Sequence, residues 1–293
     1  MKLKLPDVAL LCCDTRDALA SLESLHRSLG LVDFGECIYV TSRSAIESLP
    51  DVFVVSPLIR TVLIDPIKSI SEYSHFLLTG LGGLTEKPFI LVTQWDSWVL
   101  SPASWSDEFF RYDYIGAVWP HHTNNRIGNG GFSLRSRKLV NAAASLAANA
   151  KPESLLVEDD FICRMARPAL ESLYGCQFPT EKIANQFSSE RLGWDGRSFG
   201  FHGLLNFGRV FDSRALIQRL EMLDEGYFGD RHSVDLIRYL FSEGRLVEAK
   251  YVLGRRVALK GWSTKNLKLL VGWFFRALLV PRTFFQPVRR TSD

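Results

Sequence analysis

Cysteine is scarce in this 293-residue sequence, and its spacing argues against disulfides. The five cysteines are an odd number, and none stands in a C-x-x-C pair. Disulfides persist mainly in oxidising compartments and need paired cysteines. We therefore expect reduced thiols and a cytoplasmic protein.

Long apolar runs are also missing. No stretch reaches the roughly 18 uninterrupted apolar residues that a transmembrane helix needs. The apolar run near the N-terminus is limited by Pro6, Asp7 and Asp14, so it is too short for a signal peptide and is predicted to be a first strand. A glycine-rich phosphate loop does not follow this strand, which argues against a nucleotidyltransferase.

Acidic residues are absent from positions 250–292, a stretch that holds ten lysines and arginines. With Asp293 the charge of this tail is +9, so the net charge of +3 leaves −6 for residues 1–249. Apolar residues recur at helical spacing between 267 and 278, with basic residues among them. This pattern fits a helix that lies on an anionic membrane, and it equally fits a helix docked on the domain or at a dimer contact. Nucleic acid is not an expected partner, because the basic residues belong to an apolar segment without a nucleic-acid motif.

The chain does contain enough apolar sequence for a large core, since 46% of its residues are hydrophobic and 12% are aromatic. Short apolar runs alternate with helical patterns, which predicts an α/β fold with a mixed, mainly parallel, Rossmann-like sheet flanked by helices. In such sheets, ligands bind beyond the carboxyl ends of the strands. The predicted strands are 8–13, 37–40, 61–64, 89–93, 114–118 and 132–134. The predicted helices are 19–29 (ended by Gly30), 70–84, 137–148, 158–165, 217–223, 234–241 and 246–253.

Two polar clusters are adjacent to predicted strands. Gln94-Trp95-Asp96 comes directly after one of them, and a carboxylate in this place can hold a hard divalent ion that bridges phosphates. The ordinary alternative is a solvated aspartate that begins a loop. The glycine-rich segment 128–136 lets the backbone approach a ligand, with Asn129, Ser133 and Arg135 available for hydrogen bonds. A glycine hairpin that leads into a strand is the alternative there.

Two further clusters carry titratable groups. Glu158, Asp159 and Asp160 begin a predicted helix, and their mutual repulsion should raise the pKa of at least one of them, as suits a general base. An acidic helix N-terminus without catalytic role is the ordinary interpretation. His202 stands between glycines and aromatic residues in 199–203, which suits a metal ligand or a phosphate contact, and a histidine packed in a turn is the alternative.

The order of these clusters resembles a known family. The segments QWD, DEFFRYDYIGAVWP, GNGGFSLRS, EDDFICR and FGFHG look like a poorly characterised bacterial family of glycosyltransferase-like proteins over roughly residues 6–210. The GGFSLR and EDD segments also resemble the β-1,4-galactosyltransferases. The resemblance implies a GT-A fold, which we assign to 1–212. From the helical patterns and the charge of the remaining sequence we expect a helical segment packed on this domain at 213–258 and a basic amphipathic tail at 259–293.

The resemblance also implies roles for individual residues. Asp96 is similar to the metal-binding aspartate of the DxD motif, and His202 to a downstream histidine ligand, so that Mn²⁺ or Mg²⁺ is the implied cofactor. Gln94 stands where the motif has its first aspartate, which leaves one carboxylate. Asp159 resembles the catalytic base and Glu158 its acidic neighbour. The residues implied in donor or nucleotide binding are Asp14, Arg16, Tyr73, Gln94, Asp96, Gly130, Gly131 and Arg135.

These roles imply an enzyme that moves a sugar from a nucleotide-diphosphate donor to a hydroxyl group on a cell-surface glycan or a lipid-linked saccharide, with inversion at the anomeric carbon. Such an acceptor fits an enzyme held at the inner face of the cytoplasmic membrane by its basic tail. The alternative is a non-catalytic carbohydrate-binding or scaffold protein that keeps the fold, and Gln94 is the residue that favours it.

Overall fold

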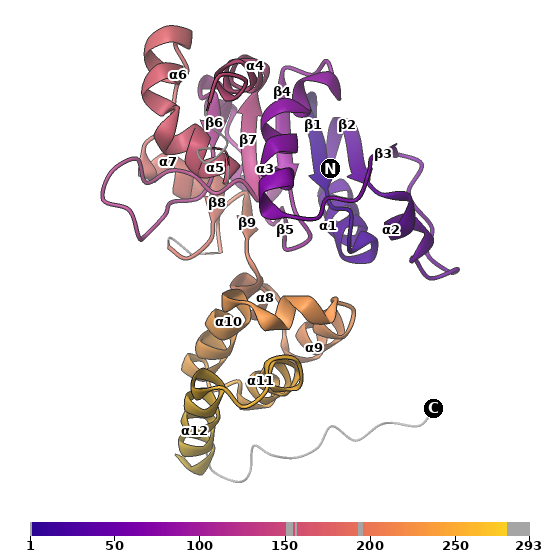
Figure 1. Cartoon of the computed structure of the whole chain (residues 1–293), viewed down its shortest axis with the longest axis vertical. Coiled ribbons are helices and arrows are strands. Elements are labelled where there is room, and N and C mark those ends of the chain that lie inside the picture. Colours follow the sequence, from indigo (N-terminus) through magenta and orange to yellow (C-terminus); the bar gives the residue numbers. More distant parts are fainter. Residues whose placement is uncertain (1, 151–154, 156, 193–195, 280–293) are drawn as a thin grey trace. The chain divides into compact units, whose positions relative to one another are not determined.

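The computed structural model describes residues 2–150, 155, 157–192 and 196–279. The chain divides into two compact units, Met1–Gly203 and Leu204–Asp293 (Figure 1). The first unit holds the sheets, and the second is built of helices. The first unit ends at Gly203, before residue 212, where the first domain was expected to end, and strand β9 (Gly200–His202) is its last strand.

The central sheet of the first unit is mixed and mainly parallel. Its strands are β1 (Leu3–Cys13), β2 (Val32–Thr41), β3 (Ile59–Leu63), β4 (Phe89–Thr93), β6 (Tyr114–Ile115) and β7 (Phe132–Ser136). Their order across the sheet is β3-β2-β1-β4-β7-β6. The first four run parallel, whereas β7 is antiparallel to both of its neighbours. The predicted α/β class, with a mainly parallel sheet flanked by helices, is confirmed.

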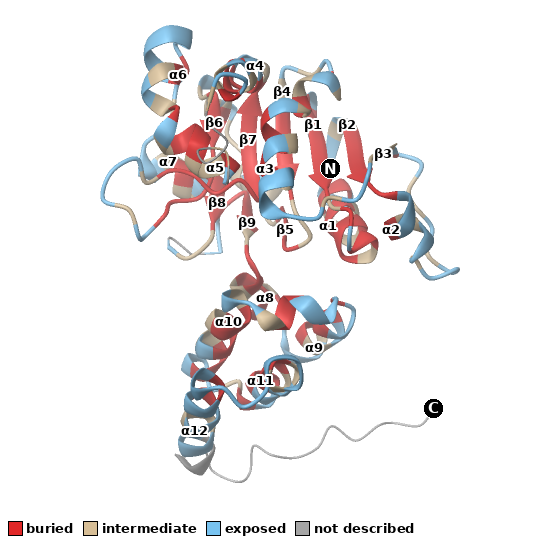
Figure 2. Cartoon of the chain, in the orientation of Figure 1, coloured by how far each residue is buried: buried red, intermediate tan, exposed pale blue. Residues whose placement is uncertain are grey.

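Helices bury both faces of this sheet, which explains why its strands are continuous apolar runs and do not alternate with polar residues. In β1, Leu10 packs toward helix α1 (Ala18–Leu31), and its neighbour Leu11 packs on the opposite face, toward α3 (Ile70–Thr79) and α4 (Arg137–Ala147). Buried residues accordingly fill the strands and the inner sides of these helices (Figure 2). The other helices of this unit are α2 (Arg43–Glu47), α5 (Glu158–Asp160), α6 (Arg167–Tyr174) and α7 (Glu181–Phe187).

A smaller sheet has the strand order β5-β9-β8, with β5 at Ser97–Val99 and β8 at Ser188–Ser189. Three residues separate the end of β4 from the start of β5, so the Gln94–Asp96 turn connects the two sheets. Helix α1 supports β5, because the Ser28 hydroxyl accepts a hydrogen bond from the Val99 backbone N–H (3.2 Å). The turn that carries the QWD motif is therefore fixed on both sides.

Some predicted boundaries are wrong in detail. Gly30 does not end α1, since the helix continues to Leu31. Gly30 is exposed, and a Cβ at this position would meet no other atom within 4 Å. The strand predicted at 114–118 joins the ladder only at Tyr114–Ile115, since the backbone then approaches Gly128 so closely that a Cβ at Gly116 would lie 1.8 Å from the Gly128 carbonyl oxygen.

The acidic run at 158–160 begins a helix, as predicted, but not a regular α-helix to residue 165. Helix α5 is a single turn, and Phe161–Met165 continues it with π-helical hydrogen bonding. Short π-helical segments are frequent at functional sites. The five cysteines are all buried free thiols.

The second unit consists of α8 (Phe207–Val210), α9 (Ser213–Glu221), α10 (Arg231–Ser242), α11 (Leu246–Lys260) and α12 (Thr264–Leu279). Helix α11 passes through the boundary expected between residues 258 and 259. Residues 280–293 of the expected tail lie outside the described residues. Within the described part of the chain, no helix has both the length and the apolar character needed to cross a membrane.

Asp113 joins β7, α4 and the chain after α6, and its removal should destabilise the first unit. One carboxylate oxygen accepts from the Ser136 hydroxyl (2.5 Å), and the other accepts from the Gln177 N–H (2.8 Å) and contacts Lys138 Nζ (2.8 Å). Asp113→Ala should lower the free energy of unfolding by about 2–3 kcal/mol, because buried donors lose a charged acceptor. Lys138→Met should cost less than about 1 kcal/mol, since the Lys138 side chain is 49% exposed. Equal losses in urea unfolding would contradict this ranking.

Candidate functional site

A pocket of about 370 Å³ opens at the carboxyl ends of β1 and β4. This is the edge of a parallel sheet at which ligands bind in open α/β folds. Asp14, Arg16, Tyr73 and Gln94, which were expected to bind a donor, line the pocket. The remaining lining residues, which were not among the expected donor-binding residues, are Cys13, Thr15, Ile67, Lys68, Ser69, Ile70 and Trp95.

The pocket favours an anionic ligand. Arg16 and Lys68 contribute positive charge, and the N-terminal residues of α3, beginning at its cap Ser69, also line it. Helix N-termini attract anions because their N–H groups and the helix dipole point outward. The Asp14 carboxylate forms hydrogen bonds within its own loop. One of its oxygens accepts from the backbone N–H of Arg16 (2.7 Å) and of Asp17 (3.2 Å). Burial nevertheless raises the pKa of Asp14.

Gln94 connects this pocket with a second group of polar side chains. Its amide nitrogen donates to the Tyr73 hydroxyl (2.8 Å), and its amide oxygen lies 3.1 Å from His202 Nε2. The backbone N–H of Gln94 donates to the Ser97 hydroxyl (2.7 Å), which fixes the turn after β4. One side chain therefore touches both the pocket and the histidine.

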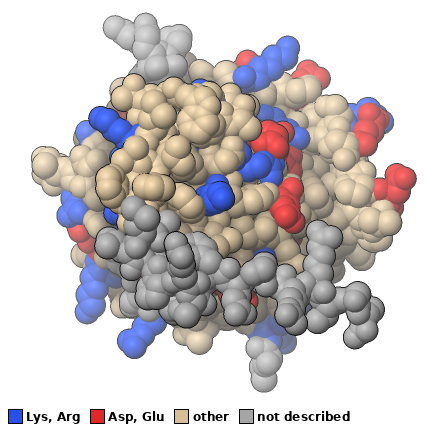
Figure 3. Space-filling view, turned by 90° about the horizontal axis from the view of Figure 1, so that it is seen from below, with Lys and Arg blue, Asp and Glu red and all other residues tan. Residues whose placement is uncertain are grey.

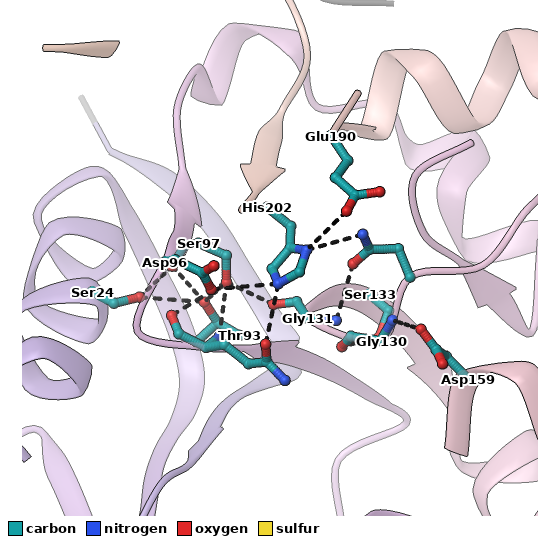
Figure 4. A network of polar contacts seen from close by, with 12 residues as sticks. Ser24, Thr93, Asp96, Ser97, Gly130, Gly131, Ser133, Asp159, Glu190 and His202 are labelled. Carbon is teal, nitrogen blue, oxygen red and sulfur yellow. Dashed lines mark hydrogen bonds and ion pairs between the residues drawn. The ribbon is translucent and has the colours of Figure 1, made fainter. Parts of the chain in front are cut away.

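His202 lies among side chains that come from distant parts of the chain (Figure 4). Its Nε2 is 3.4 Å from Asp96 Oδ1, and its Nδ1 is 3.9 Å from Glu190 Oε1. The antiparallel pairing of β9 with β5 produces this arrangement, because it sets His202 opposite Ser97. Burial favours the neutral ring, but the carboxylates of Asp96 and Glu190 outweigh it and raise the pKa of His202 to about 9.

Asn129 holds His202 and the glycine segment at the same time. Its backbone is left-handed (φ 67°), and its side-chain oxygen accepts from the Gly131 N–H (3.1 Å). That bond turns the amide nitrogen toward His202 Nδ1 (2.9 Å). The amide donor favours a neutral ring with an unprotonated Nδ1. The two carboxylates favour the protonated ring, so their effect on the ring is opposite to that of the amide.

Gly130 and Gly131 leave no room for side chains. A Cβ at Gly131 would lie 2.2 Å from His202 Nε2, and a Cβ at Gly130 would lie 2.0 Å from Glu158 Oε1. The sequence suggested that the glycines allow a ligand to approach, and the groups that approach them in the structure are protein side chains. The Gly130 N–H also donates to Asp159 Oδ2 (2.9 Å), so the two glycines stand between Asp159 and His202.

Asp159 has a strongly shifted pKa. Burial and then the charge of Glu158 raise it to about 7, although the Gly130 N–H bond favours the ionised form. The sequence predicted a raised pKa from repulsion within the acidic run, but burial is the larger cause. A carboxylate that titrates near neutral pH suits general-base chemistry.

Glu158 and Arg135 form a buried ion pair. Arg135 Nη2 lies 2.7 Å from Glu158 Oε1, and the two residues are 1% and 5% exposed. The Arg135 Nε also donates to the Ser133 hydroxyl (3.0 Å). The structure therefore places Arg135 behind the glycine segment, in the core, and away from the pocket where donor binding was expected.

Asp96 and His202 come together, as the sequence suggested for metal ligands, and the Gln94 amide oxygen is the third donor atom beside them. Among the described residues, no group of three or more His, Cys, Asp or Glu side chains could hold a metal ion. The donor set is one carboxylate, one imidazole and one amide oxygen.

Glu190 is a neighbour of the site that the sequence did not reveal. It follows β8, a two-residue strand whose pairing with β9 is visible only in the folded chain. Its carboxylate approaches His202 from the side opposite Asp96, since the two acids face different ring nitrogens. No motif around position 190 could have indicated this role.

Comparison with known proteins gives a family similarity but no activity. Residues 59–202 are similar to a family described as protein of unknown function (DUF5672). This range begins at β3 and ends at His202, so it includes the Gln94, Asp159 and His202 positions and leaves out Asp14 and Arg16. No curated protein matches the chain. The polar network around His202 thus lies wholly within the family segment, whereas the pocket lies partly outside it.

Two substitutions at Asn129 test its control of His202. Asn129→Gly and Asn129→Ala both remove the amide that opposes protonation of Nδ1, so NMR titration of the His202 ring should give a higher pKa in both variants. Only glycine adopts φ 67° without strain, and the alanine variant should therefore be less stable than the glycine variant by roughly 1–2 kcal/mol. An unchanged His202 pKa in Asn129→Gly would show that the amide does not govern the ring.

Asp159 should make the folded chain less stable as the pH rises. Its folded-state pKa is raised from 3.8 to about 7, so the folded chain binds this proton more tightly, and the free energy of unfolding decreases between these pH values. Asp159→Asn cannot ionise. Its melting temperature should match that of the parent protein near pH 4 and exceed it above about pH 7.

Asp160→Asn is the matched control for that measurement. The Asp160 carboxylate is 41% exposed and paired with Arg164, so this variant should show no gain that grows with pH. Parallel melting curves for both variants across the pH range would contradict the assignment.

Proposed function

We propose that the chain is a glycosyltransferase of the GT-A kind, which transfers a sugar from a nucleoside diphosphate donor to a hydroxyl group. The observation that carries this proposal is the position of Gln94, whose amide contacts Tyr73 in the pocket and His202 beside Asp96. A nucleotide in the pocket would extend its diphosphate toward these side chains. Pocket and polar network would then serve one bound donor.

The lining of the pocket supports a nucleoside diphosphate as the ligand. Its volume of about 370 Å³ lies in the range of small-molecule sites. Arg16, Lys68 and the start of α3 favour phosphate groups, and Trp95 offers an aromatic face for a base or a sugar. These features are chemically complementary to a donor that has a planar base at one end and negative charge at the other.

The donor atoms at Asp96, His202 and Gln94 fit a divalent cation such as Mn²⁺ or Mg²⁺. Ligands held about 2.1 Å from one ion lie roughly 3.0–3.4 Å from each other. The Nε2 of His202 lies 3.4 Å from Asp96 Oδ1 and 3.1 Å from the Gln94 amide oxygen. A bound cation supplies electrostatic stabilisation of the leaving diphosphate. The cation is part of the proposal and not of the described structure.

Asp159 is the proposed general base. It takes the proton of the acceptor hydroxyl while that oxygen forms a bond to the anomeric carbon of the donor sugar. The bond from this carbon to the diphosphate oxygen breaks, and the nucleoside diphosphate leaves with the electron pair. A single displacement of this kind inverts the anomeric configuration. Glu158 keeps Arg135 neutralised behind the glycines and orients the segment that holds Asp159.

The acceptor that we propose is a cell-surface glycan or a lipid-linked saccharide, glycosylated at the inner face of the cytoplasmic membrane. A screen with a panel of nucleotide sugars and either Mn²⁺ or Mg²⁺ tests the activity, with released nucleoside diphosphate as the readout. We expect release with one donor class and inversion in the product by NMR. A retained configuration would contradict the assignment of Asp159.

The second candidate function is a binding protein without catalysis, and the amide at position 94, where a carboxylate is usual in the DxD motif, favours it. The same screen separates the two candidates when it is combined with thermal-shift measurements. A nucleotide that raises the melting temperature without any turnover supports the binding protein. Release of nucleoside diphosphate supports the enzyme.

Replacement of Asp159 should abolish turnover but not donor binding. Asp159→Asn should reduce kcat by about 10²–10⁴, the usual contribution of a general base. Asp160→Asn, which changes the exposed neighbour, should stay within a few-fold of the parent protein. The parent rate should increase with pH through about 7, because the ionised carboxylate is the active form. Near-normal turnover by Asp159→Asn would eliminate it as the base.

A further inference from the structure

Helix α12 is anchored to the second unit along one side. Asn266 is fully buried, its side-chain oxygen accepts from Arg256 Nε (2.9 Å), and its amide nitrogen donates to the Gly261 carbonyl (2.7 Å). Six residues before the end of the helix, Trp273 Nε1 donates to the Leu246 carbonyl (2.8 Å). These bonds fix the rotation of α12 about its own axis. The side that it presents outward is therefore defined.

The outward side of α12 carries an apolar stripe. Its members recur at spacings of three and four residues and are between 36% and 62% exposed, with Phe275 the most exposed. Exposed apolar residues that are contiguous on one helix indicate an interaction surface, whereas scattered ones need no explanation. We call the following residues the α12 stripe: Leu267, Leu270, Val271, Phe274 and Phe275.

The charged residues on α12 itself and at the end of the preceding helix are all basic. Lys265 and Lys268 are exposed on the same helix, Arg276 follows the stripe, and Lys260 ends the preceding helix. No acidic residue occurs between positions 250 and 292 of the sequence. On the face drawn in the space-filling view, Lys and Arg side chains are spread among uncharged residues (Figure 3). The partner of the stripe must accept apolar side chains and positive charge together.

We infer that α12 binds the surface of a membrane that contains anionic phospholipids. The α12 stripe enters the boundary between head groups and acyl chains, and the flanking lysines remain at the level of the phosphates. An amphipathic helix with Phe and Leu on one face and basic residues beside them has the chemistry of such a surface. Trp262, 63% exposed just before the helix, adds an aromatic ring suited to the same interface.

The combination of charge and apolarity selects this partner over others. A nucleic acid would pair with the lysines but would leave two exposed phenylalanines in water. A second copy of the same helix would bury the stripe but would bring lysines of equal charge together. An anionic bilayer satisfies both sets of side chains. The inference does not depend on the glycosyltransferase proposal, because it uses only residues of the second unit.

The test is co-sedimentation of the full chain with vesicles of phosphatidylcholine alone or with phosphatidylglycerol added. We expect binding to the anionic vesicles, weakened by salt, and at least tenfold weaker binding to the neutral ones. The double substitution Phe274→Ser and Phe275→Ser should weaken binding to anionic vesicles at least tenfold. Lys265→Gln with Lys268→Gln should weaken it several-fold and should reduce its dependence on salt.

The matched control is Val52→Ser with Val54→Ser, which changes two apolar residues of the first unit that are 90% and 78% exposed. This variant should bind vesicles like the parent protein. Circular dichroism should be the same for all variants, since every changed residue is exposed. Equal binding by the Phe274 and Phe275 variant, or equal binding to neutral vesicles, would overturn the inference. The parent protein could also self-associate without vesicles and lose this association in the Phe274 and Phe275 variant. That result would overturn the inference and assign the stripe to a second copy of the chain.

Discussion

The site depends on the close approach of a glycine backbone to three side chains. Gly130 and Gly131 run between Asp159 on one side and His202 on the other, and a Cβ at these two positions would collide with Glu158 and His202. Asn129 closes the arrangement, since it bonds both to the Gly131 N–H and to the ring of His202. A side chain at Gly130 would collide with Glu158, and one at Gly131 would collide with His202. The arrangement of these side chains therefore requires glycine at both positions.

The network contains ionisable side chains that are largely shielded from water. The Arg135–Glu158 pair is buried behind the glycines, and Asp159 lies directly beside it with a raised pKa. Buried charges lower stability unless they are well paired, and protein interiors keep them mainly where function requires them. Neighbouring carboxylates raise the pKa of both Asp159 and His202, whereas burial raises the pKa of Asp159 and lowers that of His202. This is the physical reason to regard the network as a functional site.

The sequence was sufficient for the sheet and for the order of the polar clusters. The apolar run 89–93 is β4 with the same limits, and the carboxyl ends of β1 and β4 do meet at one pocket, as strand parallelism requires. Helical spacing also located α10 to within three residues at each end, whereas α11 begins at the predicted residue and continues seven residues beyond the predicted end. Local patterns were reliable here because the hydrophobic period reports directly on which face of an element is buried.

The remaining features could not be read from the sequence because they arise from long-range pairing. Glu190 reaches His202 only because β8 pairs with β9, and Arg135 turns into the core only because Glu158 is there to neutralise it. The tautomer-directing position of Asn129 depends on one left-handed residue and one hydrogen bond. Such contacts join residues far apart in the chain, and no local pattern records them.

The two units divide the proposed work, with recognition of a sugar donor in the first and attachment to a membrane surface in the second. We propose that the pocket and the His202 network hold one donor molecule through Gln94. A crystal structure with a bound nucleoside diphosphate decides whether they do. We expect the base beside Trp95, with the diphosphate extending past Gln94 toward Asp96 and His202. A nucleotide bound elsewhere, or one whose phosphates point away from Gln94, would contradict this proposal.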